Sequence, residues 1–404
     1  MINAIKITNF KSVVDLSLEL GNFNVLIGEN GCGKSNILEA IAFGAAANAD
    51  KLDYEFLGSR GIRVTNPDFM FSAFADSPQA KLIRISLIEG EKSFNYMLQN
   101  DLSNHKKWID LLKESVKTEI NRLFKSAFLE EDINRREVAI DKLNLNSLDF
   151  LSLSELIQKV KGENDFESYL TNRIVPTLVE KSFSNTELSN YIVFSPEESS
   201  LRKFEETTQI YPLGIKGEGL FQYLKEMAFD AKNKKLLTQI KENLALLDWY
   251  EDLALPKNLM QNEFSLNIKD RYLDPKLKYF DQRSTNEGFL YMLFYFTLFL
   301  SKDSPAFFAI DNIESSFNPK LCTKLIQTLA SLAKKNNKQV IVTTHNPAVL
   351  DGLNLKDQDQ RLFVVSRNMD GHTRANRIEH NPERTLRLSD IWTKGYIGGL
   401  PDNF

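Results

Sequence analysis

The sequence of 404 residues is short of several features, and each absence excludes a class of protein. Its two cysteines, Cys32 and Cys322, are too few for a disulfide framework or a cysteine-based zinc site. The richest apolar run, residues 289–300, falls short of the roughly 18 residues that a membrane span needs and indicates a buried helix. The N-terminus lacks the basic and apolar regions of a signal peptide. Together these absences predict a cytoplasmic protein without a membrane partner.

An excess of one charge is also missing. The chain has 50 Lys and Arg residues against 54 Asp and Glu residues, a net charge of -4. This balance argues against a protein that is basic all over, but it leaves room for a local nucleic-acid groove. The lysines that could form one, such as Lys106, Lys107, Lys117 and Lys125, are scattered. Charge therefore allows DNA binding but does not indicate it.

The hydrophobic pattern divides the chain into three regions. Residues 1–100 alternate short β-type runs with turns, around one helix predicted within residues 28–47. Residues 101–190 change to helical spacing and indicate a helical insertion. Residues 191–404 return to short apolar strands between helices, with a second helical stretch at about 220–275. The strand–helix–strand rhythm predicts a parallel sheet covered by helices.

The insertion begins with apolar residues at helical spacing from Trp108 to Phe124. Residues 151–160 and 169–179 indicate further helices, the second broken near Pro176. The region is too short and too poor in heptads for a long coiled-coil arm. Two roles stay open for it: a structural cap on the rest of the molecule, or a surface that binds a partner protein or DNA.

A phosphate-binding motif lies between a predicted strand and a predicted helix. Residues 28–35, Gly-Glu-Asn-Gly-Cys-Gly-Lys-Ser, match G-x-x-x-x-G-K-[ST] at every fixed position. The glycines let backbone N–H groups surround a phosphate, and the helix N-terminus adds partial positive charge. Lys34 would reach the β- and γ-phosphates, and the Ser35 hydroxyl would bind Mg²⁺. The motif predicts ATP and Mg²⁺ as ligands. The alternative is an ordinary glycine-rich turn that binds no nucleotide.

The residues around this motif resemble the ABC-type head ATPases, which include the SMC and RecF proteins and the OLD-like ATPases of bacterial antiphage systems. Residues 7–12, Ile-Thr-Asn-Phe-Lys-Ser, precede the motif, and residues 36–41, Asn-Ile-Leu-Glu-Ala-Ile, follow it. The resemblance implies an α/β fold, a P-loop NTPase head with a mixed sheet, covering helices and a helical insertion. Residues 1–100 and 191–404 would be its two parts. The implied nucleotide contacts come from Lys11, Asn30, Gly31, Cys32, Gly33, Lys34, Ser35 and Asn36.

The resemblance implies a second acidic motif at the end of a later strand. Residues 307–310, Phe-Phe-Ala-Ile, form such a strand, and Asp311 follows it, where it would hold Mg²⁺. The family usually has a catalytic glutamate next, but this chain has Asn312, which can orient water but cannot accept its proton. Glu314 matches the second acidic position of the family's D-E-x-E pattern and is the expected substitute. We therefore expect slow hydrolysis. The alternative for Glu314 is a structural role as a surface helix cap.

A histidine follows another apolar strand downstream. Residues 340–344 lead into His345, which resembles the switch histidine whose imidazole contacts the γ-phosphate. A lone histidine is more often structural, but this spacing after the acidic strand favours function. His105, His372 and His380 have no comparable context.

A fourth motif precedes the acidic strand and opens a predicted helix. Residues 284–290 are similar to the S-x-G core of the family, with Asn286 at the serine position and Gly288 at the glycine. An asparagine amide can still donate to a phosphate oxygen, and glycine permits a close backbone approach. In the family this motif closes on the nucleotide of the opposite subunit, so the resemblance implies a dimer with composite sites. A helix start without a nucleotide role is the alternative. Asn318 lies at the D-loop position, where relatives often have histidine.

Three further segments resemble OLD-like or defence-associated ATPases without a defined chemistry: residues 195–197, 212–219 and 388–401. The last is rich in aromatic and glycine residues. It either docks on a partner or packs on the core.

Three functions follow from the sequence. The first is a defence ATPase that forms a homodimer or a higher oligomer and senses or controls a separate effector, such as a nuclease or toxin. We expect that effector in trans, because the residues after Phe363 are too few for a fused nuclease domain. The second is a DNA repair or chromosome-maintenance ATPase of the RecF or SMC type that clamps DNA. The third is a nucleotide-binding scaffold without useful turnover.

Overall fold

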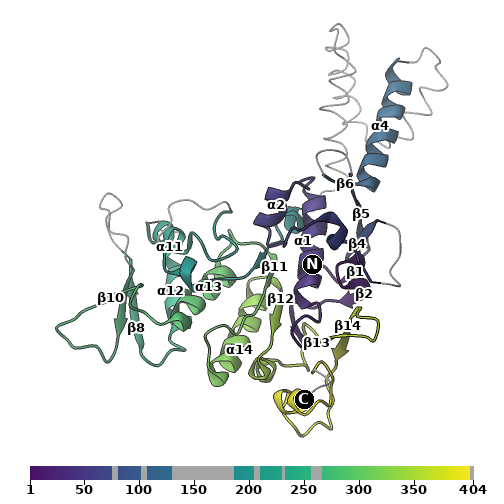
Figure 1. The fold of residues 1–404 in the computed structure, drawn as a ribbon. Helices are drawn as coiled ribbons and strands as arrows, with labels where there is room; N and C mark the ends of the chain where they lie inside the picture. The colour runs from purple at the N-terminus through teal and green to yellow at the C-terminus, as the bar shows by residue number, and fades with distance from the viewer. Residues whose placement is uncertain are drawn as a thin grey trace.

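The structure is a computed structural model that describes residues 1–74, 81–101, 107–129, 186–203, 210–229, 233–255 and 266–400. Three β-sheets and the helices around them make up this part of the chain (Figure 1). The helices predicted at 151–160 and 169–179 lie outside the described residues, as does Lys106. For residues 123–129 the structure describes the helical backbone only.

A six-stranded, mostly parallel sheet forms the centre of the molecule, in the order β14-β13-β3-β12-β11-β7. Its strands are β3 (Phe23–Ile27), β7 (Val193–Phe194), β11 (Phe307–Ile310), β12 (Gln339–Thr344), β13 (Gln360–Arg367) and β14 (Thr373–Ile378). Only β14 is antiparallel to its neighbour. The predicted parallel sheet is confirmed, and every residue of its central strands β3, β11 and β12 is buried because both faces are covered.

An antiparallel sheet of five strands lies beside the central one, in the order β2-β1-β4-β5-β6. Its strands are β1 (Ala4–Phe10), β2 (Val13–Glu19), β4 (Ile83–Glu89), β5 (Lys92–Asn100) and β6 (Trp108–Asp110). Helix α1 (Lys34–Asn48) packs between the two sheets, with small and apolar residues buried on all its sides. The short helices α2 (Tyr54–Ser59) and α3 (Pro67–Met70) follow it.

Alternate residues of the central strands face two different cores. Ala309 and Ile341 pack with α1 on one face, whereas Phe308 and Val342 pack with the helices on the other. Those helices include α13 (Glu287–Leu300) and α14 (Pro319–Lys335). The run predicted as a buried helix is confirmed, because every residue of α13 after Glu287 is buried. No helix in the described ranges has the length and apolar character needed to cross a membrane.

The region predicted as a helical stretch at about 220–275 is helical only in its first part. Helices α11 (Leu220–Phe229) and α12 (Lys234–Leu244) are followed by a three-stranded sheet of β8 (Tyr250–Ala254), β9 (Asn267–Asp270) and β10 (Phe280–Asp281). The prediction is wrong beyond Leu244 because tertiary packing decides the conformation there. Tyr250, on β8, packs on Phe289 at the start of α13, with ring centroids 5.7 Å apart.

The start of the predicted insertion is also different. Trp108 and Ile109 belong to β6, and helix α4 (Leu111–Leu129) begins only after that strand. The buried Trp108 ring lies 5.0 Å from the Phe43 ring of α1, a long-range contact that overrides the helical spacing. Helix α4 extends away from the antiparallel sheet (Figure 1). Other short helices in the described ranges are α9 (Thr186–Ser189), α10 (Glu198–Leu201), η2 (Pro347–Gly352) and α15 (Leu388–Thr393).

Candidate nucleotide-binding site

The loop of residues 28–33 connects β3 to α1, as the motif predicts. Gly31 and Gly33 have φ angles of 78° and 107°, in the left-handed region that favours glycine. Gly33 also has no room for a side chain, because a Cβ there would lie 2.1 Å from Thr373 Oγ1. Asn30 and Gly31 are exposed at the tip of the loop, whereas Cys32 is buried. The loop conformation therefore depends on glycine at positions 31 and 33.

The Lys34 side chain folds back over this loop. Its Nζ donates to the carbonyl oxygens of Gly28 and Glu29, both at 2.9 Å, and lies 3.5 Å from Nδ1 of His345. Burial lowers the pKa of Lys34, while the charges of Asp311 and Glu314 act in the opposite direction. The ammonium group is thus held by neutral carbonyls, which phosphate oxygens could replace with stronger, charge-assisted bonds.

Ser35 and Asp311 meet at the carboxyl ends of β3 and β11. Ser35 Oγ donates to Asp311 Oδ2 at 2.8 Å, and Thr343 at the end of β12 donates to the other carboxylate oxygen. A hydroxyl and a carboxylate in contact are the hard oxygen donors that Mg²⁺ prefers, so the pair fits this ion. The described residues form no cluster of three His, Cys, Asp or Glu residues that could hold a metal. Phosphates and water would have to complete the coordination of Mg²⁺.

Asn312 and Glu314 follow Asp311 in different surroundings. Asn312 is exposed and has a φ of 57°, a left-handed conformation that asparagine tolerates and that costs most other residues about 1–2 kcal/mol. Glu314 Oε1 accepts a 2.7 Å hydrogen bond from the backbone N–H of His345. Its Oε2 is buried without a hydrogen-bond partner among the described residues. Glu314 therefore does not cap a helix, and it has a free acceptor beside the cluster.

His345 lies between Lys34 and Glu314, with its Nδ1 3.5 Å from Lys34 Nζ and its backbone N–H donating to Glu314 Oε1. Burial lowers its pKa below 6.5, and the Lys34 ammonium lowers it further; the Glu314 and Asp311 carboxylates act in the opposite direction. The imidazole is consequently neutral at neutral pH.

We predict that His345 titrates below pH 6.5 in the nucleotide-free protein, which NMR of the imidazole protons can measure. The His345→Gln variant identifies the signal among the four histidines. Because the folded pKa is the lower one, the unfolded chain takes up the proton first, and this group lowers stability as the pH falls below 6.5. A midpoint at or above that value would contradict the described environment.

Lys11 and Asn36 belong to a network beside the N-terminal end of α1. Lys11 pairs with Glu39 and donates to the Arg63 carbonyl at 3.1 Å. Glu39 is only 2% exposed and also pairs with Arg63, while Asn36 donates to Ser12 Oγ at 2.7 Å. Lys11 and Asn36 both line a pocket of about 450 Å³. Glu39 thus anchors two cations next to the P-loop.

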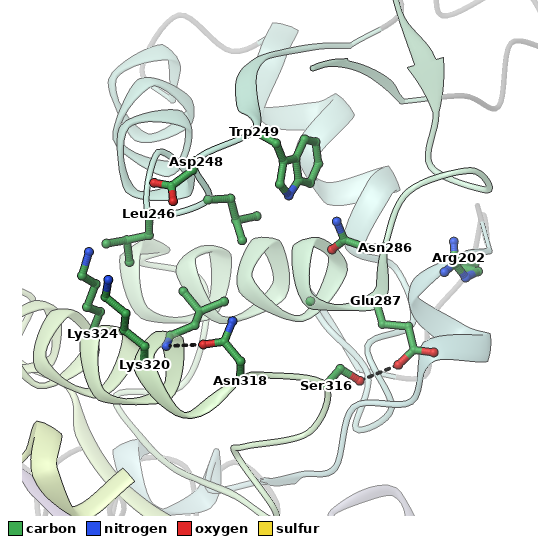
Figure 2. A pocket seen from close by; sticks show the side chains of 13 residues that line it. Arg202, Leu246, Asp248, Trp249, Asn286, Glu287, Ser316, Asn318, Lys320 and Lys324 are labelled. Atoms are coloured by element: carbon green, nitrogen blue, oxygen red, sulfur yellow. Dashed lines mark hydrogen bonds between the residues drawn. The ribbon is translucent and has the colours of Figure 1, made fainter. Parts of the chain in front are cut away.

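Asn286 and Gly288 lie apart from this cluster, at the start of α13. Asn286 Oδ1 accepts from the Phe289 N–H at 2.9 Å and caps the helix, which leaves its NH₂ group available to donate. A Cβ on Gly288 would lie 3.3 Å from the Ser316 carbonyl oxygen. Both residues line a pocket of about 730 Å³ (Figure 2). Its other walls include Trp249, Asn318, Lys320 and Lys324, and no residue of the 28–35 loop is among its described lining residues.

Two contact residues of the site were not predicted from the sequence: Thr343 and Thr373. Thr343 joins Asp311 to the Asn312 N–H, which donates to its hydroxyl at 2.9 Å, and the Thr-Thr-His run could have indicated it. Thr373 on β14 donates to the Cys32 carbonyl at 2.9 Å. It lies 341 residues from Cys32, and no local pattern indicates that contact.

Comparison with known proteins places this geometry in context. The family model described as "AAA domain, putative AbiEii toxin, Type IV TA system" matches residues 23–351. A solved SmcHead, bound in its crystal to the C-winged helix domain of ScpA, is similar at 15% identity and a TM-score of 0.52, over 94% of this chain and 97% of that chain. The SMC head domain from Thermotoga maritima has 12% identity and a TM-score of 0.47, over 94% and 99%. No curated protein matches the chain in sequence. At such identity the structural likeness shows the fold alone, that of a P-loop ATPase head.

Proposed function

This chain belongs to the AAA-domain family that matches residues 23–351, and on that premise we propose that it binds ATP with Mg²⁺ and hydrolyses it slowly. One observation carries the proposal. Lys34, Ser35, Asp311, Glu314 and His345 meet at the carboxyl ends of β3, β11 and β12. Ligands bind at this end of the strands in open α/β sheets.

Each residue of this cluster has a distinct proposed role. The loop N–H groups and Lys34 bind the β- and γ-phosphates, and Ser35 and Asp311 hold Mg²⁺, which neutralises phosphate charge when bound. His345 contacts the γ-phosphate as a neutral imidazole that can donate or accept a hydrogen bond. Lys11 and Asn36 border the pocket next to the loop, where the rest of the nucleotide would extend.

Slow turnover follows from Asn312 and Glu314, one and three positions after Asp311. Asn312 can orient water but cannot take its proton, and its left-handed backbone disfavours the usual glutamate. Glu314 Oε2, buried and without a hydrogen-bond partner among the described residues, is the acceptor in our proposal. Its other oxygen is held by the His345 N–H, so proton acceptance and γ-phosphate sensing are linked.

We further propose that two copies form each ATP site. In one copy Asn286 and Gly288 border an open pocket whose described lining includes no residue of the 28–35 loop, which favours contact with a nucleotide bound by another copy. Figure 2 shows this pocket, with Lys320 and Lys324 on α14 on one side and Asn286 near Trp249 on another. The donor amide of Asn286, the small Gly288 and the nearby lysines could bind the γ-phosphate of an ATP molecule held by the P-loop of a second copy.

A mixing experiment tests this composite site. Lys34→Ala removes the P-loop cation, and Gly288→Arg blocks the opposite surface, so each variant alone should be inactive. When the two variants are mixed in equal amounts, half of the dimers contain one copy of each. Each mixed dimer has one intact site out of two, so about a quarter of the wild-type ATPase activity should return. The matched control mixes Lys34→Ala with a Lys34→Ala, Gly288→Arg double variant, which should restore nothing. Full activity of Gly288→Arg alone would refute the composite site.

The wider role that we propose is control of a separate effector, a nuclease or toxin, in bacterial antiphage defence. The family description mentions a toxin system, which supports this role. We propose residues 101–190 as the effector-docking insertion and the rest as the head. Among the lysines considered for DNA binding, Lys117 is engaged in ion pairs with Asp50 and Glu114.

DNA clamping is the alternative outcome. Salt-dependent DNA binding by the isolated protein would favour a RecF- or SMC-type role. Co-purification of the product of a neighbouring gene, released on addition of ATP and without DNA affinity, would favour effector control.

A further inference from the structure

The chain segment of residues 387–400 packs directly behind the P-loop. A Cβ on Gly399 would lie 2.5 Å from Val364 Cγ1 and 3.6 Å from the Cα of Gly28, the first residue of the motif. Val364 is 2% exposed on β13, so it has little room to yield. At this point only a residue without a side chain lets the segment close on the loop.

The other end of the segment is attached to the chain after His345. Ser389 on α15 donates to the Asp351 carboxylate through its backbone N–H at 3.0 Å and its hydroxyl at 2.7 Å. Asp351 belongs to η2, whose N-cap is Asn346, the residue next to His345. Trp392 between the two ends is buried in the main core. The segment therefore connects the two parts of the chain that carry the P-loop and the histidine.

Gly28 is the point at which these parts meet. Its carbonyl accepts from Lys34 Nζ at 2.9 Å, and the same Nζ lies 3.5 Å from Nδ1 of His345. A Cβ on Gly28 would lie 2.0 Å from the Val365 carbonyl oxygen, so the loop cannot move toward β13. A displacement of Gly28 would consequently move a partner of Lys34, and through Lys34 the contact with His345.

From this packing we infer that residues 387–400 are a positioning element of the nucleotide site, with Gly399 setting the place of Gly28. The inference rests on the proposed ATP site. The element touches no nucleotide; it fixes the distance between the loop and the chain that carries the histidine. Binding of ATP should reorganise both ends, because phosphates would take over the Lys34 ammonium from the Gly28 and Glu29 carbonyls.

Two neighbouring glycines provide a matched test. Gly398 and Gly399 have φ angles of 73° and 76°, so alanine is equally strained at either position, but a Cβ on Gly398 would meet nothing within 4 Å. Misplacing the groups of a site by about 1 Å can lower a reaction rate by about a hundredfold. For the smaller displacement expected here, Gly399→Ala should weaken ATP binding at least about tenfold. Gly398→Ala should stay within about twofold of the wild type, as measured by calorimetry with Mg²⁺ and with Tm recorded for each protein.

If Gly399→Ala does not fold, amide hydrogen exchange of the wild-type chain tests the positioning role of residues 387–400. ATP with Mg²⁺ should slow amide exchange in residues 388–400, and Lys34→Ala should abolish that change; a purely structural tail would not respond. Equal ATP affinity of Gly398→Ala and Gly399→Ala would overturn the inference. So would amide exchange in residues 388–400 that does not change when the wild type binds ATP. A wild type that does not bind ATP overturns the proposed function itself, and the inference with it.

Discussion

Replacing Lys34 by alanine should lower the affinity for ATP by about a hundredfold or more, since hydrogen bonds to charged groups contribute about 1.5–3 kcal/mol each. The Lys34 side chain is only 5% exposed and lies within the loop, so no other lysine replaces it. Calorimetry with Mg²⁺ measures the affinity directly. The folded protein should remain intact, because the Lys34 ammonium forms no ion pair among the described residues and bonds mainly to the neutral carbonyls of Gly28 and Glu29.

Lys356→Ala is the matched control for charge, because it removes an exposed lysine and should leave ATP affinity unchanged. ATP should also raise the Tm of the wild type and of this control but not of Lys34→Ala. Unchanged ATP affinity in Lys34→Ala would show that the nucleotide does not bind at this loop.

Replacing Glu314 by glutamine should lower kcat by about a hundredfold or more while ATP affinity changes little, because general-base catalysis contributes about 10²–10⁴-fold. Glutamine can keep the bond from the His345 N–H through its carbonyl oxygen but cannot accept a proton. Single-turnover hydrolysis measures the effect separately from product release.

Asn312→Ala is the comparison variant for the same step. It removes only a water-orienting amide and should cost less than Glu314→Gln. Equal and measurable turnover in Glu314→Gln and the wild type would show that another group accepts the proton. Absence of turnover in both would indicate a nucleotide-binding scaffold.

The features that sequence could predict are those with a local cause. The P-loop is contiguous, and its glycines, Lys34 and Ser35 are required by backbone conformation and phosphate chemistry within eight positions. Asp311 and His345 each follow an apolar strand, and neighbouring parallel strands bring their carboxyl ends together. The hydrogen bond between Ser35 and Asp311 therefore follows from two local patterns and one rule of topology.

The features that sequence could not predict depend on contacts between distant segments. Trp108 has helical spacing in the sequence, yet packing on Phe43 and pairing with β5 place it in a strand. Thr373 supports the P-loop from β14, and Gly399 packs behind it, without a pattern that connects either residue to residues 28–35. Tertiary structure decides such positions, and no local preference records them.

Asn312 belongs to both groups. The family resemblance implied that Asn312 takes the place of the usual glutamate, but it offered no reason. In the structure the backbone at Asn312 is left-handed, with its N–H bonded to Thr343, and asparagine accommodates that conformation better than glutamate does. The replacement and the local backbone conformation thus agree, and they leave Glu314 as the remaining carboxylate beside Asp311.

Sedimentation of the Glu314→Gln protein, with and without ATP and Mg²⁺, tests the central claim that ATP joins two copies at composite sites. The variant keeps every proposed binding residue and hydrolyses slowly, so ATP should shift it to a dimer. The same protein with Gly288→Arg added should bind ATP and remain a monomer. A mass that is the same with and without ATP, in a protein shown to bind it, would contradict the account.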